Sequence, residues 1–103
     1  MEWKIGDSHD ARIVSLSQWL RIDRYKELRN RTGVFLFADS SRNVKYVGSA
    51  RSFRLTSEIY RAVRLDKDKD AVLVKALYTD SAESAESLRK DLISKYQPVN
   101  NLI

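Results

Sequence analysis

The sequence lacks cysteine altogether and contains one proline and three glycines among its 103 residues. Without cysteine the chain can form neither disulfides nor thiolate zinc sites. Few glycines and prolines, with 43% hydrophobic and 32% charged residues, are typical of a folded protein and not of a disordered tail. A core of this size usually closes once, so we expect a single domain over residues 1–103.

Long hydrophobic runs are also missing. The longest apolar stretches, Gly33–Ala38 and Ala71–Val74, are far shorter than the roughly 18 residues that a membrane-spanning helix needs. The first residues, Met1 to Lys4, do not form the apolar core of a signal peptide. We therefore expect a cytoplasmic protein that does not span a membrane.

Positive charge is concentrated in the middle of the chain. The formal net charge is +5, and residues 33–64 carry six basic side chains against two acidic ones, whereas residues 65–103 carry six against seven. A basic segment of this kind is typical of a surface that faces nucleic acid. The same pattern also fits a basic surface that is simply solvated, as in many small domains.

Apolar spacing in the first third predicts a helix, and the segment after it predicts a hairpin. Leu20, Tyr25 and Leu28 recur at roughly helical spacing, which favours an amphipathic helix over Ser17–Arg29. Turn-forming residues at 39–43 separate two strand-like runs, which indicates a β-hairpin. The predicted strands of this hairpin are Val34–Phe37 and Lys45–Val47.

The second half of the chain predicts a helix, a strand and a helix. Helical spacing of apolar residues indicates a helix over Ser52–Leu65, and the apolar run Ala71–Tyr78 suits a buried strand. Asp80 and Glu83 have the spacing of a capping box, which opens a last helix that Pro98 ends. The predicted fold is α/β (α+β), a small three-stranded antiparallel sheet flanked by three helices. Its N-terminal helical extension would occupy residues 1–32 and its core residues 33–101.

Two motifs in this order resemble a known family. Gly33-Val34-Phe35, followed after ten residues by Tyr46-Val47-Gly48, is similar to the pair of strand motifs that names the GIY-YIG endonucleases. Near the C-terminus, Leu92 to Pro98 followed by Asn101 resembles the closing segment of the same family. The resemblance covers about residues 33–101 and implies a GIY-YIG-like fold.

The resemblance implies hydrolysis of a DNA phosphodiester with one divalent metal ion, but this chain departs from the family at several positions. The first motif has Phe35 in place of a tyrosine, while the second keeps its tyrosine as Tyr46. The family's arginine falls on Thr56 in an ungapped count and on Arg54 if two residues are gapped. The family's metal-binding glutamate falls on Arg89, a cation that cannot ligate a divalent metal.

Glu86 lies one turn before Arg89 and is the one carboxylate that could have taken over the metal position. A divergent enzyme would then use Tyr46 and Arg54 as catalytic residues, with Mg²⁺ or Mn²⁺ on Glu86. Alternatively, Arg89 pairs with Glu86 or Glu83 on the helix surface, or it contacts a phosphate directly.

Three functions remain open, of which we favour the first. In the first, the chain is a catalytically degenerate GIY-YIG-like module that binds nucleic acid, preferably DNA, without a cofactor. The second is the divergent metal-dependent endonuclease, and the third is a protein-interaction domain whose N-terminal helix and Trp19 contact a partner or a second copy of the chain. The predicted nucleic-acid-binding residues are Arg42, Lys45, Arg51, Arg54, Arg61, Arg64 and Arg89.

Overall fold

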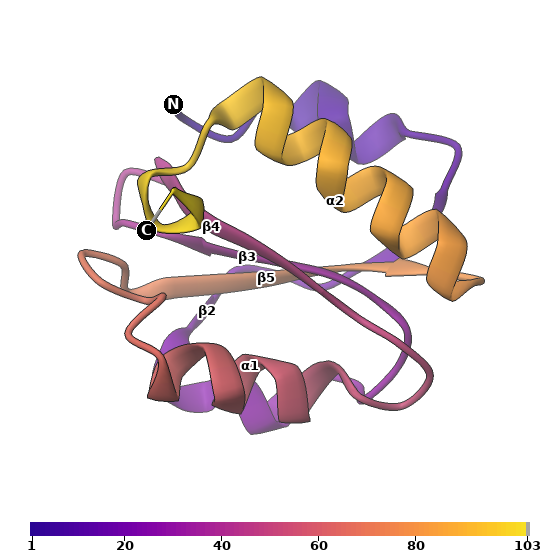
Figure 1. Cartoon of the computed structure of the whole chain (residues 1–103), viewed down its shortest axis with the longest axis horizontal. Helices are drawn as coiled ribbons and strands as arrows, with labels where there is room; N and C mark the ends of the chain where they lie inside the picture. The colour runs from indigo at the N-terminus through magenta and orange to yellow at the C-terminus, as the bar shows by residue number, and fades with distance from the viewer. Residues whose placement is uncertain (103) are drawn as a thin grey trace.

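The computed structural model describes residues 1–102 and has an antiparallel β-sheet between two α-helices that cover opposite faces of the sheet (Figure 1). The predicted α+β class with an antiparallel sheet is confirmed, but the sheet is larger than the three strands expected. The elements in chain order are η1 (Ile5–His9), β1 (Ile13–Leu16), β2 (Leu20–Arg21), η2 (Ile22–Glu27), β3 (Gly33–Ala38), β4 (Val44–Ala50), α1 (Leu55–Arg64), β5 (Leu73–Thr79), α2 (Ala82–Tyr96) and η3 (Val99–Asn101), the η elements being short 3-10 helices.

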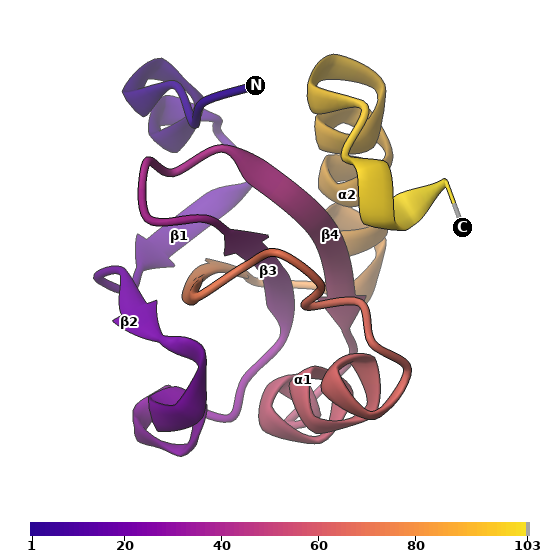
Figure 2. The same ribbon diagram turned by 90° about the vertical axis from the view of Figure 1, so that its left-hand side faces the viewer.

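The strand order is β1-β5-β3-β4, and β2 pairs with the same edge of β5 as β1 does. Strand β3 is therefore central, while β4 is an edge strand. In the register of the sheet, Phe35 lies opposite Gly48 of β4 and Ala76 of β5. In the view turned by 90°, β1 and β2 lie at one edge of the sheet, and β4 lies at the other edge, next to the two helices (Figure 2).

The central strand supplies both hydrophobic cores. Successive side chains of a strand point to opposite faces, so Phe35 and Phe37 pack with α1 while Val34 and Leu36 pack with α2. Every residue of β3 is buried. Full burial of one such side chain stabilises the fold by about 1.5–3 kcal/mol, which is why the run Gly33–Ala38 is apolar throughout.

The helix predicted over Ser17–Arg29 is wrong. Leu20 pairs with Val74 in the sheet, and the Ser17 N–H donates to the Ala76 carbonyl at 2.9 Å. The Ser17 side chain in turn accepts from the Ala76 N–H at 2.8 Å. Without this segment, one edge of the buried strand β5 would leave its backbone groups without partners, which is costly. Sheet pairing therefore overrides the helical spacing.

The apolar residues that suggested a helix are nevertheless used. Leu28 is buried in the core beneath α1, with Leu20, Ile22 and Tyr25 packed against that core. They reach it from a two-residue strand and a 3-10 helix, and not from one face of an α-helix. The spacing correctly predicted burial but not backbone conformation.

The remaining elements agree with the sequence-based expectations within a few residues. The hairpin is confirmed as β3 and β4, and the later helix, strand and helix as α1, β5 and α2. The predicted cap of the last helix is off by one residue, because Ser81 and not Asp80 is the N-cap, and its hydroxyl accepts from the Ser84 N–H at 3.0 Å. The helix ends at Tyr96, and its C-cap Gln97, whose φ of 44° is left-handed, directly precedes Pro98. None of the helices within residues 1–102 combines the length and apolar composition that a membrane crossing requires.

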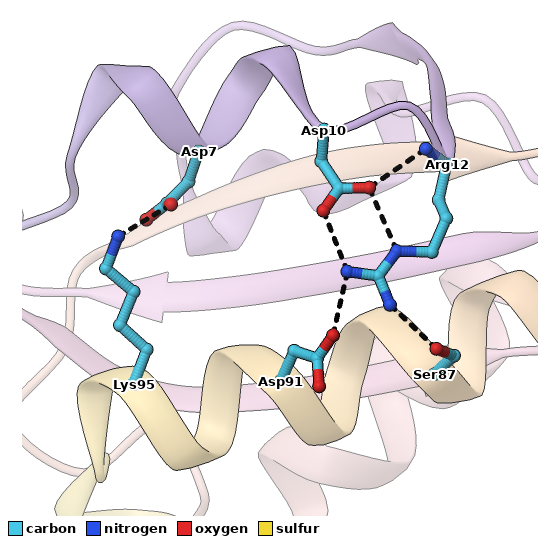
Figure 3. A network of polar contacts seen from close by, with 6 residues as sticks. All are labelled: Asp7, Asp10, Arg12, Ser87, Asp91 and Lys95. Atoms are coloured by element: carbon cyan, nitrogen blue, oxygen red, sulfur yellow. Dashed lines mark hydrogen bonds and ion pairs between the residues drawn. The ribbon is translucent and has the colours of Figure 1, made fainter.

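Ion pairs join the N-terminal segment to α2 (Figure 3). The Arg12 guanidinium donates to both carboxylate oxygens of Asp10 at 2.9 and 2.7 Å, and its Nη2 lies 2.9 Å from Asp91. Its Nη1 donates to the Ser87 hydroxyl at 2.7 Å. The hydrogen bonds from Arg12 lower the pKa of Asp10 to about 2. All three nitrogens of the Arg12 guanidinium therefore contact protein partners.

Asp7 forms a second connection to the same helix. Its carboxylate lies 2.7 Å from the Lys95 ammonium and accepts a hydrogen bond from the Tyr96 hydroxyl. Burial and the Asp7 charge raise the pKa of Tyr96, so its hydroxyl stays protonated as a donor. Trp3 stacks on the Tyr96 ring with centroids 5.7 Å apart.

Candidate functional site

A cleft of about 560 Å³ lies beside the C-terminal end of the edge strand β4, between the N-terminal parts of α1 and α2. A smaller hollow of about 220 Å³ adjoins it and includes Tyr46 and Arg61. The two share Ser49 and Glu58 in their walls. The larger cleft is lined by Ser49, Ala50, Arg51, Arg54, Glu58, Ala82, Glu83, Ala85 and Glu86.

Phe35 is at the position where the resemblance implies a tyrosine. Its ring lies over Gly48 of the neighbouring strand β4. Its side chain is only 2% exposed. A Cβ atom added at Gly48 would lie 2.3 Å from the Phe35 Cζ, closer than carbon atoms can approach. Gly48 is therefore required by the phenylalanine ring across the hairpin. Phe35 has no hydroxyl that could take part in proton transfer.

Tyr46 is the one phenol of the two motifs, and it lines the smaller hollow. Its ring packs against Phe35 and Phe37 with centroids 6.0 and 5.8 Å apart. Burial raises the pKa of the Tyr46 hydroxyl, and the positive charge of Arg89 acts in the opposite direction. Tyr46 is thus protonated near neutral pH and can donate a hydrogen bond, but it is a poor base. Its hydroxyl makes no hydrogen bond within residues 1–102.

Arg89 and Glu86 form a bidentate ion pair on α2. Arg89 Nη2 lies 2.5 Å from Glu86 Oε1, and Arg89 Nε lies 3.0 Å from Glu86 Oε2. The Ser49 hydroxyl donates to the same Oε2 at 3.1 Å. Hydrogen bonds from Arg89, with a smaller contribution from Ser49, lower the pKa of Glu86 to about 2. Of the two surface partners expected for Arg89, the structure selects Glu86 and not Glu83.

This pairing does not suit a divalent metal ion at Glu86. Both carboxylate oxygens already accept hydrogen bonds, and a guanidinium lies against them. Within residues 1–102 no three His, Cys, Asp or Glu side chains gather in an arrangement that could hold a metal. Mg²⁺ and Mn²⁺ prefer shells of several oxygen ligands, so the donor set around Glu86 does not fit the metal that the resemblance implies.

The two candidate positions for the family's arginine, Arg54 and Thr56, line different hollows. Arg54 lines the larger cleft together with Ser49 and Glu86. Thr56 does not line this cleft but a different hollow, and its backbone N–H donates to the Asn30 side chain at 3.0 Å. The structure therefore brings Arg54, and not Thr56, to the cleft.

Four arginines gather where the hairpin opens. Gly33, the first residue of β3, pairs with Ala50, the last residue of β4, so the loops before β3 and after β4 are neighbours. Figure 1 shows both loops at the same end of the sheet. We call this region the arginine end. It comprises Arg29, Arg31, Arg51 and Arg54, which are exposed and form no ion pair within residues 1–102.

The other predicted nucleic-acid-binding residues are engaged or lie elsewhere. Arg64 donates to the Tyr60 hydroxyl at 3.1 Å, Arg61 lies 3.8 Å from Glu58, and Arg89 is held by Glu86. Arg42 and Lys45 lie at the closed end of the hairpin, opposite the arginine end, and the Lys45 ammonium is 4.0 Å from Asp39. Of the seven residues, Arg51 and Arg54 are the ones that belong to the arginine end.

Several residues of this region were not predicted from the sequence. Arg29 and Arg31 fell within or next to the segment assigned to a helix, so their position beside the hairpin was hidden. Glu58 follows Arg54 by four residues and precedes Arg61 by three, a spacing that places all three on one face of a helix. That spacing could have identified Glu58. Nothing in the sequence pointed to Ser49 as a partner of Glu86.

No family model matches the chain, and a search of the curated proteins finds no similar sequence.

Proposed function

We propose that this protein is a nucleic-acid-binding module of GIY-YIG type that does not cut its ligand, with DNA as the favoured ligand. The observation that carries the proposal is the arginine end, where Arg29, Arg31, Arg51 and Arg54 form no ion pair with any carboxylate of residues 1–102. Guanidinium groups donate two parallel hydrogen bonds to a phosphate, which suits them to a nucleic-acid backbone. Such contacts release counterions and give binding that weakens as salt increases.

The phosphate backbone would follow the loops and not the floor of the cleft. Glu58, Glu83 and Glu86 line the cleft wall and would repel phosphates. Glu86 is neutralised by Arg89, and Glu58 lies near Arg61, but Glu83 is exposed and forms no ion pair within residues 1–102. Arg51 and Arg54 share this cleft with the carboxylates, whereas Arg29 and Arg31 lie on the neighbouring loop and do not line it.

Three features argue against cleavage. Phe35 supplies no hydroxyl, Tyr46 is protonated near neutral pH, and both oxygens of Glu86 are occupied. A phosphodiesterase needs a proton acceptor and a cation at the leaving oxygen. Binding without chemistry is the function that these side chains support.

Divergent nuclease activity is the second candidate. It is favoured by one observation, namely that Arg54 and Glu86 line the same cleft and that Tyr46 lies in the adjoining hollow. Activity would require the Arg89–Glu86 pair to open, which would leave the Glu86 carboxylate free to contact another ligand.

The test is an assay that follows binding and cleavage of labelled oligonucleotides and plasmid together. Reactions contain Mg²⁺, Mn²⁺ or a chelator at low and at moderate salt. We expect binding that weakens with salt and no cleavage under any condition. Cleavage that disappears in Glu86→Ala would contradict the proposal and support the nuclease. Absence of both binding and cleavage would also contradict it and would favour a protein partner.

A further inference from the structure

One residue of the loop between β4 and α1 combines two unusual properties. Phe53 is 74% exposed, more than any other aromatic side chain of residues 1–102, the next being Tyr60 at 51%. Its backbone has a φ of 56°, in the left-handed region that side chains with a Cβ avoid. The fold thus holds a bulky aromatic residue in a strained conformation with its ring in solvent.

Neither property is explained by stability. An exposed ring buries little apolar area and so adds little to the core. Glycine would adopt the same backbone conformation without strain. Strained backbone that persists is concentrated at sites where it serves function. The exposed phenylalanine is therefore better explained by contact with a ligand than by a contribution to stability.

The neighbours of Phe53 indicate what its ring contacts. Arg51 precedes it by two residues and Arg54 follows it directly, and both are exposed and without an ion pair within residues 1–102. Guanidinium groups beside an exposed aromatic ring are the combination with which proteins bind single-stranded nucleic acid, the cations on phosphates and the ring on a base. An apolar protein surface would have to desolvate these unpaired charges, which is unfavourable.

We propose that Phe53 is a stacking residue for an unpaired nucleobase, so that the ligand class of this module is single-stranded or locally unpaired nucleic acid. The proposal rests on the nucleic-acid-binding function proposed above. In a matched duplex each base is already stacked on its neighbours and offers no face to the ring. In a single strand, a bulge or an unpaired end, a base can stack on Phe53 while Arg51 and Arg54 hold the flanking phosphates.

The test measures affinity for three oligonucleotides that share one sequence: a single strand, a duplex with one unpaired base and a matched duplex. The single strand and the bulged duplex each carry the fluorescent adenine analogue 2-aminopurine at one position, whose emission falls on stacking. We expect the wild-type protein to bind the two unpaired ligands about tenfold more tightly than the matched duplex and to quench the fluorophore.

Variants separate stacking from other roles of the residue. Phe53→Gly should lose the preference and the quenching while its unfolding midpoint does not fall, because glycine relieves the backbone strain. Phe53→Trp should keep both, whereas Phe53→Leu, which is apolar but has no π face, should lose both. Tyr60→Ala, at the other strongly exposed aromatic side chain, is the control and should leave the preference unchanged.

The outcomes distinguish this inference from the function on which it rests. Equal affinity of the wild type for all three ligands, or an unchanged preference in Phe53→Gly, would overturn the stacking role while leaving nucleic-acid binding intact. No salt-dependent binding of any of the three would overturn the proposed function and this inference with it.

Discussion

Arg12 and Arg54 belong to the same chain, but their surroundings differ completely. Arg12 lies between Asp10 and Asp91, donates to Ser87, and is about 25% exposed. Arg54 is exposed, lines an open cleft and has no carboxylate partner within residues 1–102. Arg12 stabilises the fold through ion pairs, whereas Arg54 takes part in no ion pair within residues 1–102.

The difference separates arginines whose charge is used in ion pairs of the fold from arginines whose charge is available to a ligand. Around Arg12 the partners come from the N-terminal segment and from α2, so its ion pairs join parts of the chain that are far apart in sequence. At the arginine end, four like charges lie on two adjacent loops and form no ion pair within residues 1–102, so their mutual repulsion costs electrostatic free energy. A bound polyanion would remove that cost.

Reversing charge at the arginine end should have the largest effect. The double variant Arg51→Glu with Arg54→Glu should lower nucleic-acid affinity by more than about 100-fold at moderate salt, because two attractive contacts become repulsive. Fluorescence anisotropy with a labelled single strand measures this loss. The control is Arg42→Glu with Lys45→Glu, which changes net charge equally at the opposite end of the hairpin. An equal loss in the control would mean that binding follows net charge and not position.

Truncating Arg12 should lower the stability of the protein but leave its nucleic-acid affinity nearly unchanged. Arg12→Ala removes a partly buried cation and leaves Asp10 and Asp91 unpaired, which should lower the free energy of unfolding by about 1–2 kcal/mol. Nucleic-acid affinity should stay within about twofold of the wild type. Urea unfolding and anisotropy measure the two quantities. Normal stability with weakened binding would contradict the division between the two regions.

Lowering the pH should remove the stabilisation that comes from the ion pair between Asp10 and Arg12. The pKa of Asp10 is about 2 in the folded protein, below its ordinary value of 3.8, so the unfolded chain binds more protons between these values. The stabilisation from Asp10 is therefore complete above about pH 4 and is lost as pH falls toward 2. In Arg12→Ala this loss should be smaller, since the pKa of Asp10 returns toward its ordinary value. Urea midpoints measured across the acid range for both proteins test this, and parallel curves would be inconsistent with it.

The smallest effect is expected at Ser49. Ser49→Ala removes one hydrogen bond to Glu86 but leaves the bidentate pair with Arg89 intact. We expect a change in the free energy of unfolding of about 0.5 kcal/mol and a small rise in the pKa of Glu86. NMR titration of the Glu86 side chain measures that pKa. A return of the pKa to its ordinary range would mean that Ser49, and not Arg89, is the main cause of the shift.

The parts of the fold that sequence patterns predicted are those in which local spacing and tertiary environment agree. The run Gly33–Ala38 is apolar at every position and becomes a strand buried on both faces. The helix α1 has a clear apolar stripe that packs on the sheet. The segment 17–29 was wrongly predicted as a helix because its apolar residues have helical spacing. In the structure, its first residues pair instead with the edge of β5. The spacing of residues within one segment gives no information on whether a strand far along the chain needs a pairing partner.

For the candidate site, the sequence identified residue types but not their neighbours. The missing hydroxyl of Phe35 and the positive charge of Arg89 are evident from the sequence, whereas their meaning for catalysis depends on the resemblance to GIY-YIG endonucleases. The ion pair between Arg89 and Glu86 could be named only as one of two alternatives, since Glu83 lies on the same helix. The proximity of Arg29 and Arg31 to Arg51 depends on the pairing of Gly33 with Ala50, and so on the fold as a whole.

The salt dependence of nucleic-acid binding tests the central claim most directly. The logarithm of the association constant is measured against the logarithm of salt concentration for the wild type and for Arg51→Ala with Arg54→Ala. If the two guanidinium groups contact phosphates, the slope of the double variant should be shallower by about 1.4–1.8, or 0.7–0.9 for each lost contact. A slope equal to that of the wild type would show that these arginines do not contact the backbone, and it would contradict the account.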